Sequence, residues 1–480
     1  MNNKAAPSKS SIDGAMALHR QGKYPKAAKI YQKILKQDPK NLLALNLMAE
    51  ASLMLGKSSQ ALQLAERALK LKPNMPSTSL LRANALARMG QEKAAIEGYN
   101  DVLALQPENA PAMLSLGVAL RAAGENSQAI ITFEKLVELK PDFAQAHFNL
   151  ANAFKDEGLQ EDALLSYDDT LAISPKMAEA WVNKAATLLH LDRPEEALES
   201  AEQALKVKPT VSAYLNAGNA CRNLARISQA EVHYQKALAL APKDARLNAQ
   251  IGLLLADQDR QDEAVKQFKV ACALAPRDKS IEADMALSLL ASGNLHEGWH
   301  HYEARFAKSE ARDAYASSPL ARWIGEPLEG RNLLIWTEQG VGDILRFTSC
   351  IPDLLEVAQK QNSKVFLKTE PRLISLFQRA FPTAQVSSRH TTEDEEQVEL
   401  HLPIGSLPQL LRPTLASFEN KTAYLTPASE QLNAMKAFVA SLPGSCNVGF
   451  AWRSGNMASH RQHHYGSLSD WKPLFAQSNV

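Results

Sequence analysis

A short phrase that ends in proline recurs along more than half of the chain at an almost constant interval. Successive prolines lie 34 residues apart, with a single step of 33, at Pro39, Pro73, Pro107, Pro141, Pro175, Pro209, Pro242 and Pro276. In the same register an alanine recurs at Ala27, Ala61, Ala95, Ala129, Ala163, Ala197, Ala230 and Ala264. Four positions after it stands an aromatic residue or another alanine. A period of this length predicts a stack of helix pairs in which each pair contacts only its neighbours.

Each recurring residue type has a structural reason. Glycines separate the two helical patterns of five units, at Gly22, Gly56, Gly90, Gly124 and Gly158. A glycine permits the backbone conformation that ends one helix and turns into the next. The alanine lets two helix backbones approach closely, and the aromatic residue one turn later fills the gap beside it. The proline cannot continue the second helix and therefore ends each unit.

This pattern closely resembles the tetratricopeptide repeat, in length and at every signature position. The resemblance covers residues 8–278 as eight units, after a lead-in at residues 1–7 that is expected to be disordered. A degenerate ninth unit is expected at residues 279–312, where GNLHEGWHHYEARF lacks the final proline, as a terminal capping unit can. The predicted architecture is an α-solenoid of tetratricopeptide repeats with a concave groove, followed by an α/β Rossmann-like domain.

Four amide side chains occupy the same place in successive units: Asn149, Asn183, Asn216 and Gln250. A ladder of amides offers donors and acceptors that suit the backbone of an extended peptide. It resembles the asparagine ladder of the nucleocytoplasmic O-GlcNAc transferases, which also join such repeats to a glycosyltransferase. Asparagine at this place is equally typical of ordinary repeats, so both interpretations stay open.

The character of the chain changes after residue 312. Residues 313–330 are expected to be a connector, residues 331–428 a Rossmann-like α/β domain, and residues 429–480 a linker helix and the start of a second α/β domain. Because that second domain is cut short, we interpret the sequence as a truncated gene product or a fragment. Strands are predicted at 333–336, 364–369, 384–388 and 398–402, and helices at 344–361, 371–381 and 429–442. Such alternation indicates a parallel sheet with crossover helices.

The turn TEQGVGD, residues 337–343, follows the first predicted strand of this domain. In an open parallel sheet, ligands bind beyond the carboxyl ends of the strands, and glycines such as Gly340 and Gly342 let the backbone approach a ligand. Asp343 stands where a helix N-cap is expected, so a cap is the simpler interpretation of this residue. Glu338 is expected to be a loop acid and Arg346 a cation on a helix face.

The segments GWHHYEARF, EQGVGDILRF and GFAWRSGN together resemble a bacterial group in which tetratricopeptide repeats precede a glycosyltransferase. That glycosyltransferase is related to the heptosyltransferases of lipopolysaccharide synthesis. The resemblance implies two Rossmann-like domains that face each other across a cleft, with Asp343 as the catalytic base. It implies donor-phosphate contacts at Gly340, Gly342, Arg453, Ser454, Gly455 and Asn456.

Composition excludes several other function classes. A net charge of +1 argues against a mainly electrostatic nucleic-acid binder. No apolar run is long enough to span a bilayer, so no membrane span is expected. Four separated cysteines favour a reducing cytoplasm, and the histidines of SHRQHHYG lack partners for a metal site, so no metal is expected.

Two functions follow. The first is a cytoplasmic, repeat-scaffolded, inverting glycosyltransferase that takes a nucleotide-sugar as substrate, needs no cofactor, and acts on a protein or glycan acceptor recruited by the repeats. The second is a non-catalytic scaffold that binds a protein or peptide in the groove and carries a vestigial glycosyltransferase-like domain. In the first case activity is expected of the complete protein, and the truncated chain is expected to lack it, because most donor-binding residues would come from the missing remainder.

Overall fold

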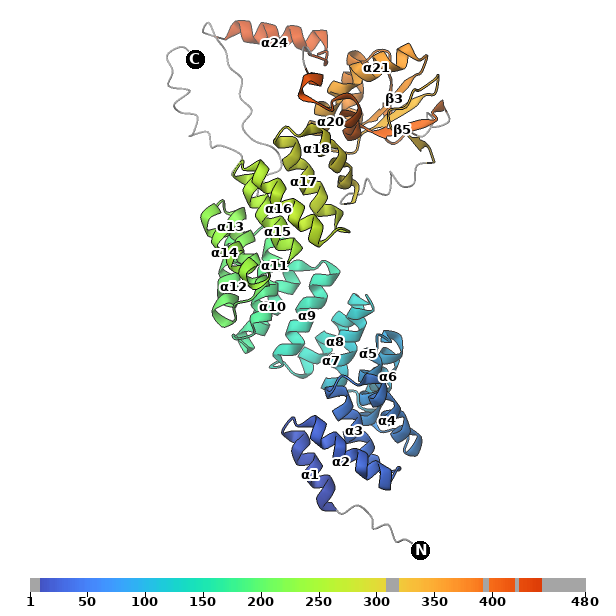
Figure 1. The fold of residues 1–480 in the computed structure, drawn as a ribbon, viewed down its shortest axis with the longest axis vertical. Helices are drawn as coiled ribbons and strands as arrows, with labels where there is room; N and C mark the ends of the chain where they lie inside the picture. The colour runs from blue at the N-terminus through green and yellow to red at the C-terminus, as the bar shows by residue number, and fades with distance from the viewer. Residues whose placement is uncertain (1–8, 308–318, 392–396, 419–422, 443–480) are drawn as a thin grey trace. The chain divides into compact units, whose positions relative to one another are not determined.

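The computed structural model describes residues 9–307, 319–391, 397–418 and 423–442 (Figure 1). Contacts between Cα atoms divide the chain into two compact units, Met1–Pro209 and Thr210–Val480. The first unit consists of helices alone, among the residues described there. The second begins with further helix pairs and continues into a small parallel sheet.

Consecutive helices of the first unit pack against each other in pairs. These helices are α1 (Lys9–Arg20), α2 (Tyr24–Gln37), α3 (Leu42–Met54), α4 (Ser58–Leu71), α5 (Pro76–Ala87), α6 (Glu92–Leu105), α7 (Ala110–Ala122), α8 (Asn126–Leu139), α9 (Ala144–Glu157), α10 (Gln160–Ile173), α11 (Ala178–His190) and α12 (Pro194–Val207). Each predicted repeat thus forms two helices of similar length.

The second unit opens with three more pairs. They are α13 (Val211–Asn223), α14 (Ile227–Leu240), α15 (Ala245–Asp257), α16 (Gln261–Leu274), α17 (Lys279–Ala291) and α18 (Leu295–Tyr302). A 3-10 helix, η1 (Glu303–Ala307), continues α18 directly. The expected ninth repeat is therefore the pair α17–α18, which packs together like the others.

The turn between the two helices of a unit uses one left-handed backbone position. In five units that position is glycine, from Gly22 (φ 71°) to Gly158 (φ 86°), as the spacing predicted. In the next three units the same position is Asp192 (φ 58°), Ala225 (φ 55°) and Asp259 (φ 59°), before glycine returns at Gly293 (φ 82°). The turn geometry is therefore kept even where a side chain makes it strained.

In three helix pairs a glycine faces the recurring aromatic ring of the partner helix. A Cβ atom added at Gly117 would lie 2.5 Å from the Phe133 ring, and one added at Gly218 would lie 2.3 Å from the Tyr234 ring. Both rings are buried, at 0% and 1% exposed. The aromatic residue thus fills space that the small residue leaves, which explains the pairing of the two residue types in the repeat.

The sheet has five strands, and every pair of neighbouring strands is parallel. The strands are β1 (Ala321–Arg322), β2 (Leu333–Trp336), β3 (Val365–Thr369), β4 (Gln385–Ser388) and β5 (Leu400–Pro403). Their order across the sheet is β1-β5-β2-β3-β4. Four strands agree with the predicted segments to within about two residues. The fifth, β1, is a short edge strand inside the segment that the sequence suggested was only a connector.

Helices cover one face of this sheet. They are α20 (Val341–Phe347), η2 (Thr348–Cys350), α21 (Ile351–Lys360), η3 (Pro371–Leu373), α22 (Ile374–Ala380), η5 (Ile404–Ser406) and α23 (Leu407–Leu411), and η6 (Leu415–Phe418) and α24 (Ser429–Ser441) follow. Alternate strand residues, such as Leu333 and Ile335 of β2, join Phe347 and Ile351 in the core. The helix predicted at 344–361, with an interruption near Pro352, is divided into α20 and α21 by η2.

Candidate functional site

The glycine turn after β2 leads directly into α20. Gly340 is the N-cap of this helix, so Asp343 is the third helical residue and not the cap that the sequence suggested. The helix begins earlier than predicted because Val341 and Gly342 already have helical geometry. Asp343 is half-exposed. Its carboxylate is therefore not committed to capping the helix.

In the part of the chain that the structure describes, neither the backbone conformation nor the packing requires glycine at Gly340 or Gly342. Gly340 has a φ of −64°, which any residue adopts, and Gly342 is not among the residues with positive φ. A Cβ atom added at either position would meet nothing within 4 Å. Space is therefore open beside this turn.

That turn borders a cavity of about 430 Å³ between the last helix pair and the sheet. The sheet side contributes the turn after β2 and the start of α20, and the opposite side comes from α17, α18 and η1. The lining residues are Ala283, Asp284, Leu287, Leu290, Trp299, Tyr302, Arg305, Phe306, Glu338, Gln339, Asp343, Arg346 and Phe347. A cavity of this size is within the range of small-ligand sites, about 300 to 1,000 Å³.

Arg305 holds the two sides together. Its guanidinium donates to Glu303 at 2.9 Å, to Glu338 at 3.0 Å and to the Ser406 hydroxyl at 2.9 Å. The same group stacks on the rings of Tyr302 and Phe306, 4.5 Å and 4.1 Å from their centroids. Arg305 belongs to η1, whereas two of its partners follow strands of the sheet.

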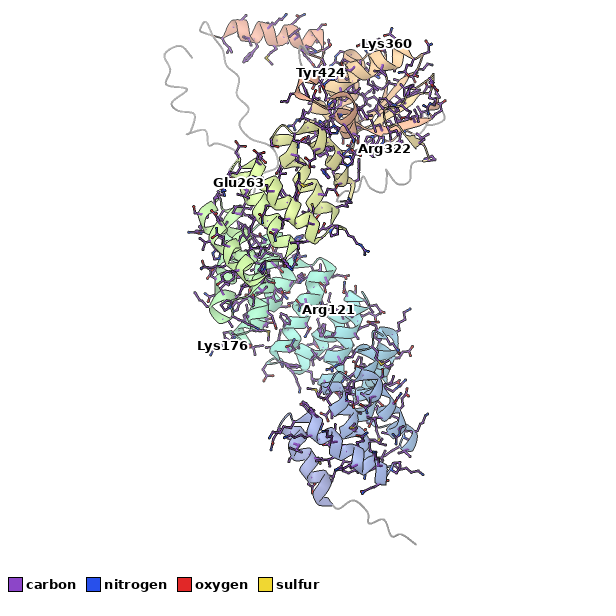
Figure 2. The ribbon with its side chains drawn as sticks, in the orientation of Figure 1. Arg121, Lys176, Glu263, Arg322, Lys360 and Tyr424 are labelled. Carbon is purple, nitrogen blue, oxygen red and sulfur yellow. The ribbon has the colours of Figure 1, made fainter. Side chains whose placement is uncertain are left out.

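Further hydrogen bonds join the last helix pair to the sheet. Trp299 Nε1 donates to the Arg412 carbonyl at 3.1 Å, and Gln339 Nε2 donates to the Tyr302 hydroxyl at 2.7 Å. Arg322 on β1, labelled in Figure 2, donates to Glu303. Burial raises the pKa of Tyr302, so its hydroxyl stays neutral at physiological pH.

Glu338 is the most deeply buried acid of the cavity, with a side chain that is 2% exposed. Its Oε1 accepts from Arg305 and from the Gly405 backbone N–H at 3.2 Å. Its Oε2 has no hydrogen-bond partner among the described residues. Burial raises the pKa of Glu338, although Arg305 acts in the opposite direction. The sequence suggested a loop acid here, and Glu338 does lie in the loop between β2 and α20, where it is buried.

Glu303 is in the opposite electrostatic situation. Burial acts to raise its pKa, but the guanidinium groups of Arg305 and Arg322 outweigh it and hold the pKa below its usual range. The surroundings of Glu303 therefore favour its ionised form, whereas the surroundings of Glu338 disfavour its ionised form.

The strand order places this network at a defined point of the sheet. From β2 the chain moves to β3 and β4 on one side, and β5 then returns to the other side of β2. In open parallel sheets, ligands bind where the order reverses, beyond the carboxyl ends of the two strands. Glu338 follows β2 and Ser406 follows β5. Arg305 therefore occupies the crevice between them, and the larger cavity lies beside it.

The predicted amide ladder is buried at two positions, Asn149 and Asn216, and half-buried at the other two. Asn149 is 7% exposed, and its Nδ2 donates to the Gln145 carbonyl of its own helix at 2.7 Å. Asn183 Nδ2 donates at 2.8 Å to Asn152 Oδ1, which also accepts from the Tyr167 hydroxyl at 2.7 Å. At Asn149 and Asn183, at least one amide hydrogen is used inside the repeat.

The other two ladder positions belong to the second unit. Asn216 is 8% exposed and Gln250 is half-buried. One repeat further along, the same position is Asp284, which lines the cavity. The structure thus connects the ladder register to the cavity through a residue that sequence reasoning missed. A comparison of the ninth repeat with the others would have found it.

The first unit has a groove of its own, about 610 Å³ in volume. It crosses the first helices of three successive pairs, α3, α5 and α7. Most of its lining is apolar: Leu53, Met54, Leu80, Leu81, Ala87, Leu114, Val118, Ala119 and Ala122. Met54 and Val118 are 53% and 44% exposed, so an apolar surface is open there.

Several expectations concern residues outside the described ranges. Arg453, Ser454, Gly455 and Asn456 all lie there. Within the described part of the chain, no three potential ligand side chains are grouped to hold a metal ion. No helix described by the structure is long and apolar enough to cross a membrane.

Comparisons with known proteins agree with the repeat pattern. Residues 18–85, 148–211 and 211–244 match models of the tetratricopeptide repeat, and residues 117–158 match a model described as TPR repeat. Protein FlbA of Caulobacter vibrioides is 32% identical over 208 residues, which are 41% of this chain and 35% of FlbA. The match therefore spans about a third of that relative.

Solved structures also resemble the chain. The APC/C hetero-tetramer Cut9–Hcn1 has 16% identity and a TM-score of 0.42, over 62% of this chain and 72% of that one. YrrB, described as a TPR protein with an unusual peptide-binding site, has 21% identity and a TM-score of 0.33, over 39% of this chain and 96% of that one. From the family models, residues 18–85 and 117–244 are tetratricopeptide repeats.

Proposed function

We propose that the chain is a tetratricopeptide-scaffolded, glycosyltransferase-like protein. It transfers a sugar from a nucleotide-sugar donor to a protein or glycan acceptor that the repeats recruit. The observation that carries this proposal is the place of Asp343, half-exposed in a cavity beyond the carboxyl end of β2. The opposite wall of that cavity is the last helix pair of the repeats. The parallel pairing and strand order of the sheet, and the resemblance of EQGVGDILRF to the heptosyltransferase-related group, support it.

The chemistry is coherent with these residues. A sugar acceptor hydroxyl is a poor nucleophile, and a positioned carboxylate such as Asp343 removes its proton as it attacks the anomeric carbon of the donor. The acceptor oxygen forms a bond to the anomeric carbon, and the bond from that carbon to the nucleotide diphosphate breaks. The nucleotide diphosphate leaves with the electron pair of the broken bond. The resemblance assigns the stabilisation of that leaving group to Arg453 and its neighbours, and to backbone approach at Gly340 and Gly342. This scheme uses no cofactor and no metal ion.

A second candidate is a binding scaffold whose sheet is only a cap for the repeats. The specific observation in its favour is the position of the Arg305 side chain, which belongs to the repeat segment. It lies between the ends of β2 and β5, where the strand order reverses, and donates to Glu338 and Ser406 there. The apolar groove over α3, α5 and α7 offers a surface for a protein partner in either case. Protein or peptide binding by the repeats is therefore common to both candidates.

The experiment that separates them uses the full-length gene product. Donor hydrolysis and sugar transfer are measured for the wild type and for Asp343→Asn. Transfer that depends on Asp343 supports the enzyme. Normal partner binding, with no transfer to any acceptor and no donor hydrolysis, supports the scaffold. A triple variant, Asn149→Ala with Asn183→Ala and Asn216→Ala, tests whether the ladder contributes to partner binding.

A further inference from the structure

The first turn of α20, which carries Asp343, has little packing of its own. Gly340 and Gly342 are exposed, and a Cβ atom added at either glycine would meet nothing within 4 Å. None of the residues 340–343 is buried, although Val341 packs partly against the core. The helix has seven residues, and a helix of that length is not stable on its own. The position of Asp343 therefore depends on the contacts that hold the chain at the two ends of this turn.

The helix side of the turn is held by packing and by the helix itself. Ile344 and Phe347 belong to the core of the sheet. The first hydrogen bond of α20 runs from the Ile344 N–H to the Gly340 carbonyl at 2.9 Å. The hydroxyl of Tyr424, labelled in Figure 2, donates to the Leu345 carbonyl. These contacts fix α20 from Ile344 onwards and leave the entry of the chain into the turn to be fixed by other residues.

The strand side of the turn is held by Gln339, which directly precedes Gly340. Its Nε2 donates to the Tyr302 hydroxyl at 2.7 Å. Gly405 lies close to the same side chain, because a Cβ atom added there would lie 3.2 Å from Gln339 Nε2. The Gln339 side chain therefore has a defined place between a tyrosine of the last repeat and the loop after β5. It is the last side chain that fixes the chain before the turn of Asp343.

Tyr302 is a rigid partner for this hydrogen bond. Its ring contacts the rings of Trp299 and Phe347, with centroids 5.6 Å and 6.3 Å away. The Arg305 guanidinium lies 4.5 Å from the centroid of the same ring. Burial raises the pKa of Tyr302, and the charge of Asp343 acts in the same direction, so the hydroxyl stays neutral at physiological pH. The packed ring therefore presents Gln339 with an acceptor of fixed position and constant charge.

From these contacts we propose that Tyr302 is a positioning residue, which fixes the turn that carries Asp343 through its hydrogen bond with Gln339. The segment GWHHYEARF of the last repeat thus supports the candidate base of the sheet. Tyr302 acts at one remove, and its role requires no contact of its own with a substrate. A displacement of about 1 Å at a reacting group can lower a rate by about 10²-fold, so one hydrogen bond at this point has a large effect on transfer. The inference rests on the proposed function for that effect on transfer, whereas the hold on the turn is measured without catalysis.

The first test compares the full-length protein with Tyr302→Phe, Gln339→Leu and the double variant. Phenylalanine keeps the ring and its contacts and removes only the hydroxyl that accepts from Gln339. Exchange of amide hydrogens with deuterium is followed by mass spectrometry on the peptide that covers residues 339–347. We expect each single variant to exchange about fivefold to tenfold faster than wild type in this peptide. The double variant should exchange no faster than the single variants, because the two groups form one hydrogen bond.

The second test separates positioning from a purely structural role. In Tyr302→Phe we expect kcat for sugar transfer to fall by about tenfold with an unchanged KM for the donor, because a displaced base weakens the transition state alone. Tyr234→Phe is the matched control, since it removes a hydroxyl that donates to Asn219 at 2.7 Å within the repeats. It should change neither the exchange of residues 339–347 nor kcat.

The outcomes distinguish this inference from the proposed function. Circular dichroism confirms that each variant is folded. The inference is overturned if residues 339–347 exchange equally fast in Tyr302→Phe and wild type, if the effects of the two substitutions add in the double variant, or if Tyr302→Phe keeps the kcat of an active wild type. A wild type without sugar transfer, in which Tyr302→Phe still speeds exchange, would reject the proposed function and retain the hold of Tyr302 on the turn.

Discussion

Arg305 Nη2 lies 3.0 Å from Glu338 Oε1, and this ion pair joins the end of the repeats to the first strand-to-helix turn of the sheet. The two residues are 33 positions apart and come from different kinds of structure, a 3-10 helix and a loop after a strand. The last repeat is therefore part of the cavity that contains Asp343, not a spacer before it.

Loss of Arg305 should destabilise the second unit strongly. Arg305→Met leaves Glu338 buried without its cation, and we expect a loss of about 3 to 5 kcal/mol in the free energy of unfolding. Chemical unfolding is followed by tryptophan fluorescence in a Trp181→Phe background. The other five tryptophans all lie beyond residue 298, so the signal then reports on the second unit alone.

A matched control and a double variant complete that experiment. Lys360→Met removes a solvent-exposed pair with Glu356 on α21, at 2.7 Å, and should change stability by less than about 1 kcal/mol. Adding Glu338→Gln to Arg305→Met should recover a large part of the loss, because the unpaired carboxylate is gone. If the double variant is no more stable than Arg305→Met, the buried charge is not the cause.

The stability of the second unit should depend on the ionisation of Glu338. Its folded-state pKa is raised by burial, so its contribution to stability is complete below the ordinary glutamate pKa of about 4.3. That contribution is lost as the pH rises through the raised value. Glutamine does not titrate, so the stability of Glu338→Gln relative to wild type should increase between about pH 4 and pH 7.

Urea unfolding at several pH values checks this sign. The exposed control Glu356→Gln should show a much smaller change relative to wild type over the same range. If the stability of Glu338→Gln relative to wild type instead falls as the pH rises, the ion pair with Arg305 has a larger effect on the pKa of Glu338 than burial has.

Gly218 is expected to tolerate no side chain. A methyl group there would lie 2.3 Å from the buried Tyr234 ring, whose hydroxyl donates to Asn219 at 2.7 Å. Gly218→Ala should therefore lower stability by about 1 to 3 kcal/mol through overpacking. The same unfolding assay measures it. No loss of stability would show that the helix pair has room to separate.

Gly342 should behave in the opposite way. Its added methyl group meets nothing within 4 Å, and it lies in α20, so Gly342→Ala should preserve or slightly raise stability, by up to about 1 kcal/mol. If a donor approaches this turn, sugar transfer should nevertheless fall by roughly tenfold. Gly340→Ala serves as a second test of the same turn. Unchanged transfer in both variants would place the donor elsewhere.

The helix pairs were predictable because their signals are local. Proline, glycine, alanine and the aromatic residue each act within one or two turns of a helix, and their spacing repeats. The strands β2 and β3 were predictable for the same reason, since LLIW and KVFLKT are short apolar runs. The short strand β1 was missed because two residues carry no period, and only pairing with β5 makes them a strand.

The site was less predictable because its key contacts are distant in sequence. Asp343 could be found from a glycine turn after a strand. Arg305 meets Glu338 and Ser406 across 33 and 101 positions, and no spacing rule indicates such pairs. Glu338 was correctly placed in a loop, but nothing in TEQGVGD shows that an arginine from the repeats covers it.

The central claim is that Asp343 does chemistry in a cavity shared by the repeats and the sheet. The most direct measurement is the rate of sugar transfer by the full-length gene product, compared between wild type and Asp343→Asn under saturating donor. We expect a fall of about 10²- to 10⁴-fold, as for loss of a general base, with unchanged circular dichroism and unchanged partner binding. A rate for Asp343→Asn equal to that of the wild type would contradict the account.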